Sequence, residues 1–166
     1  KVVKGFAYFD FTSYCFSGIE MKKAPEKRVG EVGCTWDQAT ATPKEQPFAM
    51  KTEKEFQYMI QAETTPNRLK SFVISDALEN CLTMDDASKV SVINSLGQDV
   101  TEQFDVAVEG QTVICSAKAD SLKEEAFTDN QTYTFILKVH RKPEGQFDIS
   151  KYLAEDGYTL LVPNQA

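Results

Sequence analysis

The sequence predicts an all-β fold, an immunoglobulin-like antiparallel β-sandwich with one or two short crossover helices. Three observations lead to this prediction. Apolar and polar residues alternate with period two in many short runs, turn residues separate these runs at regular intervals, and no alternating strand and helix units occur. Many short strands joined by turns are typical of sandwiches, whereas a parallel sheet needs a crossover between successive strands.

The first 21 residues differ from the rest of the chain because aromatic residues crowd together there. These are Phe6, Tyr8, Phe9, Phe11, Tyr14 and Phe16. A polar stretch from Lys22 to Lys27 follows. We therefore predict an aromatic-rich arm, or the end of a preceding domain, over residues 1–21 and the sandwich domain over residues 22–166. Residues 30–47 contain two glycines and two prolines, which predicts a long loop carrying the only tryptophan, Trp36.

At least seven strands are expected after this loop. The positions that define them are Phe56, Tyr58, Ile60 and Ala62; Phe72 and Ile74; Val90 and Val92; Phe104, Val106 and Val108; Thr112 to Ala117; Tyr133, Phe135, Leu137 and Val139; and Tyr158, Leu160 and Val162. The tight-turn signal Glu109-Gly110-Gln111 predicts a hairpin. The last strand is expected to end at Pro163. Short helical signals cover residues 121–127 and 149–154, where Asp148 is placed to cap the first turn.

Charge and hydropathy exclude several classes of partner. The chain has 166 residues and a formal net charge of −7, so it has no electrostatic basis for binding nucleic acid or an anionic membrane surface. No apolar run is long enough to cross a bilayer, and membrane insertion of this fragment is not expected. The chain begins at Lys1, which is typical of an excised fragment whose export signal and wall anchor lie elsewhere.

Motifs for catalysis or cofactor binding are missing from the sequence. It has no nucleophile elbow, phosphate-binding glycine loop, zinc protease motif or EF-hand loop, and we expect no cofactor and no metal. The sole histidine, His140, is expected to face solvent in a structural role. Acidic pairs at Asp85-Asp86 and Glu124-Glu125 could ligate calcium, but a solvated charged surface is the favoured interpretation.

Four cysteines leave their pairing open. Cys15, Cys34, Cys81 and Cys115 are too widely spaced for a CxxC metal site. Two disulfides would suit an exported protein, and four buried thiols are about as plausible because cysteine packs as a small apolar residue.

Three polar residues stand where the alternation predicts burial. Side chains two residues apart lie on the same face of a strand. Asp76 is therefore expected on the face of Phe72 and Ile74, Asn164 on the apolar face of the last strand, and Lys27 on the face of Val29. An unpaired buried charge is costly, so these side chains must pair, neutralise or react.

A lysine, an aspartate and an asparagine brought together in an apolar core can react. Burial disfavours charge on both ionisable groups, which gives a neutral amine nucleophile beside a protonated acid. The acid can then polarise the carboxamide and transfer protons. The product is an amide between Nζ and Cγ, formed with loss of ammonia.

Several segments resemble the isopeptide-forming immunoglobulin-like domains of Gram-positive fimbrial and antigen I/II-type surface adhesins. In chain order, which is also the order in the family, they are Pro25–Val29 (PEKRV), Lys70–Leu78 (KSFVISDAL), Gly97–Phe104 (GQDVTEQF), Val108–Val113 (VEGQTV) and Leu161–Ala166 (LVPNQA). The resemblance covers residues 22–166. It implies that Lys27 is the amine, Asn164 the carboxamide and Asp76 the catalytic acid. This chain departs from the family in two ways. Cysteines are unusual in such domains. The first 21 residues have no counterpart in the family, so Lys4 or Lys23 could compete with Lys27 as the nucleophile.

The leading hypothesis is therefore a structural stalk domain of an extracellular, cell wall-anchored adhesin or pilin that undergoes only single-turnover isopeptide formation. Its expected partners are neighbouring domains of the same surface protein. The alternative is a disulfide-stabilised ligand-binding module, in which the aromatic arm or the Trp36 loop contacts a host protein or glycan. The solvent exposure of Trp36 discriminates between them, because an exposed indole favours recognition and a buried one favours the stalk.

Overall fold

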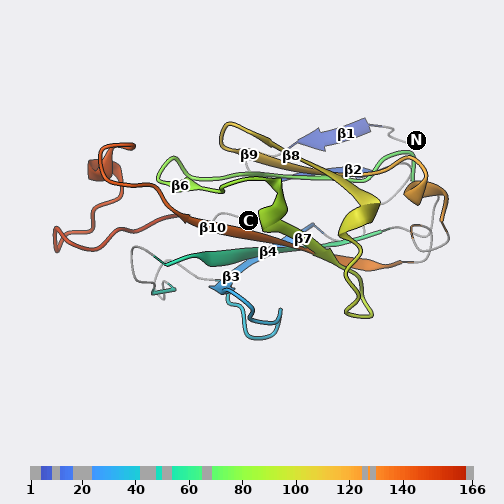
Figure 1. The fold of residues 1–166 in the computed structure, drawn as a ribbon, viewed down its shortest axis with the longest axis horizontal. Coiled ribbons are helices and arrows are strands. Elements are labelled where there is room, and N and C mark those ends of the chain that lie inside the picture. Colours follow the sequence, from blue (N-terminus) through green and yellow to red (C-terminus); the bar gives the residue numbers. More distant parts are fainter. Residues whose placement is uncertain are drawn as a thin grey trace.

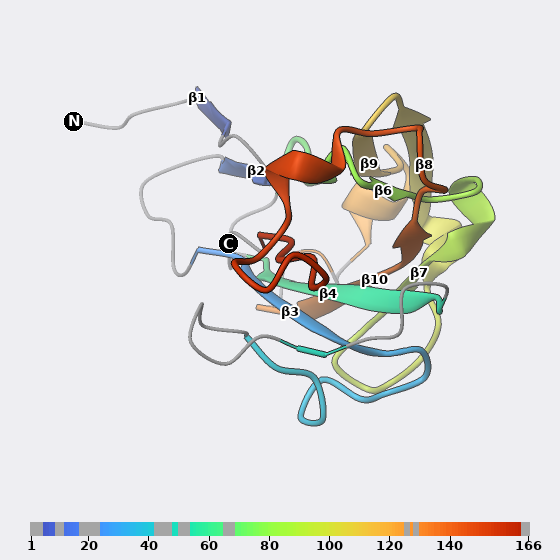
Figure 2. The same cartoon turned by 90° about the vertical axis from the view of Figure 1, so that its left-hand side faces the viewer.

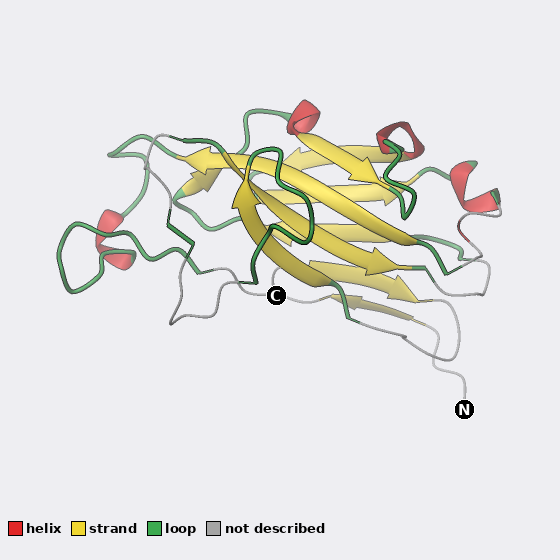
Figure 3. Cartoon of the chain, turned by 90° about the horizontal axis from the view of Figure 1, so that it is seen from below, coloured by secondary structure: helices red, strands yellow, loops and turns green. Residues whose placement is uncertain are grey.

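The computed structural model describes residues 5–8, 12–16, 24–41, 48–49, 54–64, 69–124, 127 and 130–163. These residues form two antiparallel sheets that pack face to face, which confirms the predicted sandwich (Figure 1). The short 3-10 helices lie at the ends of the strands and cover neither sheet (Figure 3). Within the described ranges, no helix has the length and apolar character needed to cross a membrane.

The first sheet has the strand order β1-β2-β5-β9-β8. Its strands are β1 (Gly5–Tyr8), β2 (Thr12–Phe16), β5 (Val73–Ala77), β9 (Thr112–Ala117) and β8 (Phe104–Glu109). The predicted hairpin joins β8 to β9, and Gly110 takes the positive φ of 62° that its turn requires.

The second sheet is built around the longest strand, β10. Its members are β3 (Glu26–Glu31), β4 (Phe56–Glu63), β10 (Thr132–Arg141), β7 (Val90–Ile93) and β6 (Leu82–Thr83). β4 separates β3 from β10, while β7 and β6 pair with successive parts of the other edge of β10. The short helices are η1 (Ala87–Lys89), η2 (Thr101–Gln103), η3 (Ser121–Lys123) and η5 (Ile149–Lys151), and Asp148 caps η5 as predicted.

Aromatic rings fill the space between the sheets at one end of the sandwich. Neighbouring centroids lie 5.0–6.4 Å apart in a cluster formed by Phe72, Phe104, Phe127, Tyr133 and Phe135. Leu137 and Val139 continue the buried face of β10. The alternation that predicted these positions therefore identified the core face of the strand.

The prediction for the outer face of β4 was wrong at two positions. The alternation of Phe56, Tyr58, Ile60 and Ala62 with Gln57 and Met59 predicts a half-buried strand with the latter two facing solvent, but both are buried because the loop after β3 folds over this face. The Gln57 side chain accepts a hydrogen bond from the Gly33 amide and donates one to the Cys34 carbonyl, so its polar atoms are satisfied.

The predicted last strand is also wrong in part. Among the described residues, the segment 158–162 makes a single bridge, between Leu160 and Leu153, and Tyr158 is 91% exposed. Asp156 accepts hydrogen bonds from the amides of Tyr158 and Thr159, which holds this segment in a turn. Leu160 and Val162 nevertheless pack against the main core as their parity predicts.

The predicted arm contributes two strands, β1 and β2. β2 pairs with β5 through the registers Thr12↔Asp76 and Ser13↔Ser75. The division between residues 1–21 and 22–166 stays a prediction, because nothing in the described structure defines a domain boundary there.

Candidate functional site

The candidate site lies between β3 of one sheet and β5 of the other. Lys27 pairs with Ile60 across the β3–β4 ladder, and Asp76 pairs with Val113 across the β5–β9 ladder. Both side chains point inward because they share the parity of the neighbouring core residues, Val29 and Ile74. Figure 2 shows β2 and β3 on the same side of the sandwich, where the described part of the chain also ends.

Lys27 and Asp76 meet across the two sheets. Lys27 Nζ donates a hydrogen bond of 2.9 Å to Asp76 Oδ1, and the side chains are only 6% and 1% exposed. Asp76 Oδ2 is buried and has no hydrogen-bond partner among the described residues. A carboxylate accepts several hydrogen bonds, so this oxygen has capacity for a further donor or for a proton.

Burial dominates the electrostatics of the acid. Desolvation raises the pKa of Asp76 above its ordinary value, and the adjacent Lys27 ammonium only partly offsets this effect. The buried thiol of Cys115 is affected in the same way, because desolvation and then the charge of Asp76 raise its pKa to about 12. The site thus favours the neutral acid that the proposed chemistry needs.

Tyr58 is a part of the site that sequence reasoning missed. Lys27 Nζ lies 4.1 Å from the centroid of its ring, and Tyr58 is 4% exposed. The signal was present in the sequence, because Tyr58 lies on the inward face of the strand that follows β3. The alternation within single strands does not show that β3 pairs with β4, and this pairing is what brings Tyr58 beside Lys27.

The third predicted residue, Asn164, lies outside the described residues, as do the alternative nucleophiles Lys4 and Lys23. The nearest described residues of the same parity are Leu160 and Val162. The structure therefore brings two of the three predicted groups together.

Free thiols are found at the three cysteines whose side chains the structure describes. Cys81 and Cys115 are buried, and Cys34 is partly buried. The side chain of Cys15 lies outside the described part of the chain.

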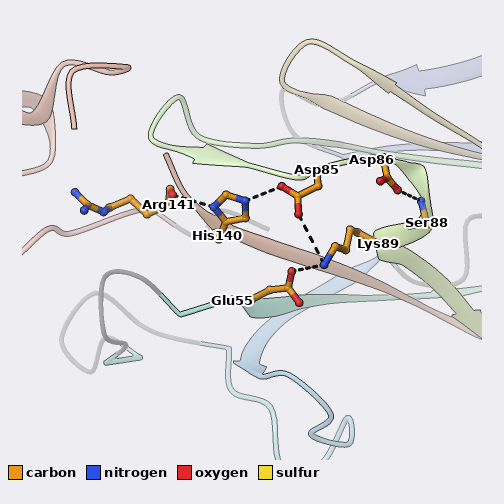
Figure 4. A network of polar contacts seen from close by, with 7 residues as sticks. All are labelled: Glu55, Asp85, Asp86, Ser88, Lys89, His140 and Arg141. Carbon is orange, nitrogen blue, oxygen red and sulfur yellow. Dashed lines mark hydrogen bonds and ion pairs between the residues drawn. The ribbon is translucent and has the colours of Figure 1, made fainter. Parts of the chain in front are cut away.

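His140 lies on the surface in a chain of charged contacts (Figure 4). Its Nε2 is 2.9 Å from Asp85 Oδ1, and Lys89 Nζ is 3.8 Å from Asp85 Oδ2 and 2.7 Å from Glu55. The His140–Asp85 hydrogen bond is the main reason that the pKa of His140 is raised and that of Asp85 is lowered.

The acidic pairs of the sequence have other roles where they are described. Asp86 accepts a hydrogen bond from the Ser88 amide and caps η1, while Asp85 contacts His140. Glu124 is described but Glu125 is not. Among the described residues, no three His, Cys, Asp or Glu side chains are placed to hold a metal ion.

Trp36 is half-buried and packs against a small cluster outside the second sheet. The cluster consists of Ala39, Met59 and Ile136, with Cys34 and Ile93 at its margin. The Arg28 guanidinium lies 4.3 Å from the centre of the indole ring. These contacts engage part of the indole in packing, and the ring is neither fully exposed nor fully buried.

Comparison with known proteins agrees with this fold. Residues 49–160 match the family described as the cell surface antigen I/II C2 terminal domain. The chain belongs to this family. A search of curated proteins finds no significant match.

Solved structures place the antigen I/II C2 domain among folds found in bacterial pilins. This chain is similar to BcpA, the major pilin subunit of Bacillus cereus, with 20% sequence identity and a TM-score of 0.51. The match covers 74% of this chain and 32% of the BcpA chain. This chain is also similar to the pilus backbone protein RrgB of Streptococcus pneumoniae, with 10% identity and a TM-score of 0.50 over 72% of this chain and 28% of that one. The chain thus spans about a third of the length of these proteins, and the likeness establishes the fold.

Proposed function

We propose that this domain is a structural stalk unit of a Gram-positive, cell wall-anchored surface protein, in which an amide bond between Lys27 and Asn164 joins the first strand to the last. The observation that carries the proposal is the buried contact between Lys27 and Asp76, with one oxygen of Asp76 left without a described partner. A buried ion pair adds little net stability compared with apolar packing, so its presence needs another reason.

The reaction requires only groups of this chain. Asp76 takes a proton from the Lys27 ammonium, which leaves a neutral amine beside a neutral acid. Lys27 Nζ then attacks Cγ of Asn164, the bond from Cγ to the amide nitrogen breaks, and that nitrogen leaves as ammonia. Asp76 polarises the carboxamide as the acid, delivers the proton that the leaving nitrogen needs and takes up the proton that Nζ loses as it becomes the amide nitrogen. The reaction consumes its own nucleophile, so it turns over once and the domain is not an enzyme for external substrates.

The amide would have a mechanical consequence. It would close a loop that contains nearly the whole domain, and disulfides that close loops of about 100 residues contribute roughly 4 to 5 kcal/mol of stability. Force applied to the ends of the domain would pass through a covalent bond instead of through hydrogen bonds between strands. Such a domain would suit an extracellular spacer whose partners are neighbouring domains of the same protein.

Two observations favour the stalk over a disulfide-stabilised ligand-binding module. The described cysteines carry free thiols, and Trp36 is engaged in packing.

High-accuracy intact mass after full reduction tests the proposal. The measured mass of the wild type is expected to be one ammonia molecule below the mass calculated from its sequence. Asp76→Ala and Asn164→Ala are expected to have the masses calculated from their sequences. Peptide mapping should place the loss on a branched peptide that contains Lys27 and Asn164. A branch at Lys4 or Lys23 would identify a different nucleophile, and a full wild-type mass would reject the amide.

A further inference from the structure

The ring of Tyr58 is held in a fixed position beneath the Lys27 amine. Tyr58 lies on β4, and the edge-to-face contact with Phe56 has a centroid distance of 5.4 Å and an interplanar angle of 81°. Within the sheet, Tyr58 is paired with Val29 of β3 on one edge of β4 and with Leu137 of β10 on the other. A buried aromatic ring with these neighbours cannot move without disturbing the core.

Two contacts from two different sheets therefore fix Lys27 Nζ. The negative face of the Tyr58 ring attracts the ammonium from within the second sheet, and Asp76 binds it from the first. A lysine side chain has a long flexible stem, and an amine that must attack one carbon atom needs its orientation fixed in advance. The pair of contacts provides that orientation.

We propose that Tyr58 is a positioning residue for amide formation, whose ring face holds Lys27 Nζ beside Asp76 and shields it from water. This inference rests on the proposed function. Tyr58 forms no bond in the reaction, and the bond that forms joins Nζ to Cγ of Asn164. Burial and the negative charge of Asp76 raise the pKa of Tyr58, so the phenol keeps its proton and the ring makes the contribution.

Rates of amide formation in three variants test this role. Cell-free synthesis followed by intact mass at successive times gives the rate from the loss of ammonia. Tyr58→Phe keeps the ring face and is expected to react within about twofold of the wild type, whereas Tyr58→Leu is expected to react at least about tenfold more slowly. Tyr133→Leu is the matched control, because Tyr133 is equally buried but belongs to the aromatic cluster with Phe72. Equal rates for Tyr58→Leu and the wild type, or equal slowing by Tyr133→Leu, would overturn the proposal.

A second measurement does not depend on the reaction. In the Asn164→Ala background, which cannot form the amide, the ring current of Tyr58 should shift the NMR signals of the Lys27 ε-methylene group upfield. The shift is expected to persist in Tyr58→Phe and to disappear in Tyr58→Leu. An unshifted Lys27 signal in the parent overturns the positioning itself. If the wild type forms no amide but the Lys27 signal is shifted, the proposed function and the role of Tyr58 in the reaction are both overturned. The contact between Tyr58 and Lys27 then still stands.

Discussion

The buried pair of Lys27 with Asp76 and the surface pair of His140 with Asp85 are joined at the same distance, 2.9 Å, in opposite environments. Asp76 is 1% exposed and Asp85 is 53% exposed. The pKa of Asp76 is raised because desolvation outweighs its partner, whereas the pKa of Asp85 is lowered because its partner outweighs desolvation. Distance alone therefore does not define an ion pair, since the surrounding solvent decides whether the acid tends toward its neutral or its charged form.

The two pairs consequently suit different tasks. A carboxyl group whose charge is disfavoured can exchange a proton with a neighbouring amine, which is what amide formation needs. A carboxylate that water stabilises can only bind its partner weakly and add to the solubility of the surface. Three experiments test this contrast.

The largest effect is expected when the buried pair loses one partner. In the Asn164→Ala background, where no amide contributes, Asp76→Ala should lower the free energy of unfolding by about 3–5 kcal/mol because it leaves a buried ammonium without its counter-charge. Urea unfolding followed by tryptophan fluorescence gives this value. Asp85→Ala in the same background is the control and should have a much smaller effect, since water replaces the lost contact. Similar losses in the two variants would contradict the contrast.

A smaller effect is expected when both partners of the buried pair are replaced by apolar residues. Lys27→Met with Asp76→Leu, again in the Asn164→Ala background, should unfold within about 1 kcal/mol of its parent or be more stable, because no charge remains to be desolvated. The comparison with Asp76→Ala separates the cost of an unpaired charge from the cost of lost volume. If the double variant is as unstable as Asp76→Ala, the pair is needed for folding and its burial requires no reactive role.

The buried pair also illustrates how far sequence reasoning extends. The positions of Lys27 and Asp76 could be predicted because the period-two pattern assigns each residue of a strand to one face, and the same rule identified the buried face of β10. The burial of Gln57 and Met59 could not be predicted, because the alternation within one strand does not show that the loop after β3 folds over its outer face. The pattern also failed at Tyr158, where the hydrogen bonds of Asp156 form a turn that the alternation does not encode. Tyr58 needed the pairing of β3 with β4, which single-strand periodicity does not contain.

The smallest effect is expected at the surface pair, and it should appear as a pH dependence. Both ring nitrogens of His140 face acceptors, since Nδ1 lies 3.0 Å from the Arg141 carbonyl and Nε2 lies 2.9 Å from Asp85. A neutral imidazole donates from only one nitrogen, so the charged form satisfies both contacts. This geometry is consistent with the raised pKa of His140, to which Glu55 and Asp85 also contribute by their charge.

The sign of the effect follows from that direction. A raised folded-state pKa means that the stabilising contribution of His140 is fully present below its unfolded pKa, near 6.5, and is lost as the pH rises through the folded value. The urea midpoint of the wild type should therefore decrease between about pH 6 and about pH 8.5, and this decrease should be absent in His140→Gln. His140 is the only histidine in the sequence, and both proteins keep the same four cysteines, so the difference between the two pH profiles isolates the contribution of the imidazole. The difference between the two proteins should shrink in about 1 M salt, because exposed charges are screened there. A wild-type midpoint that stays level across this pH range would show that water competes successfully for His140 even at 2.9 Å from Asp85.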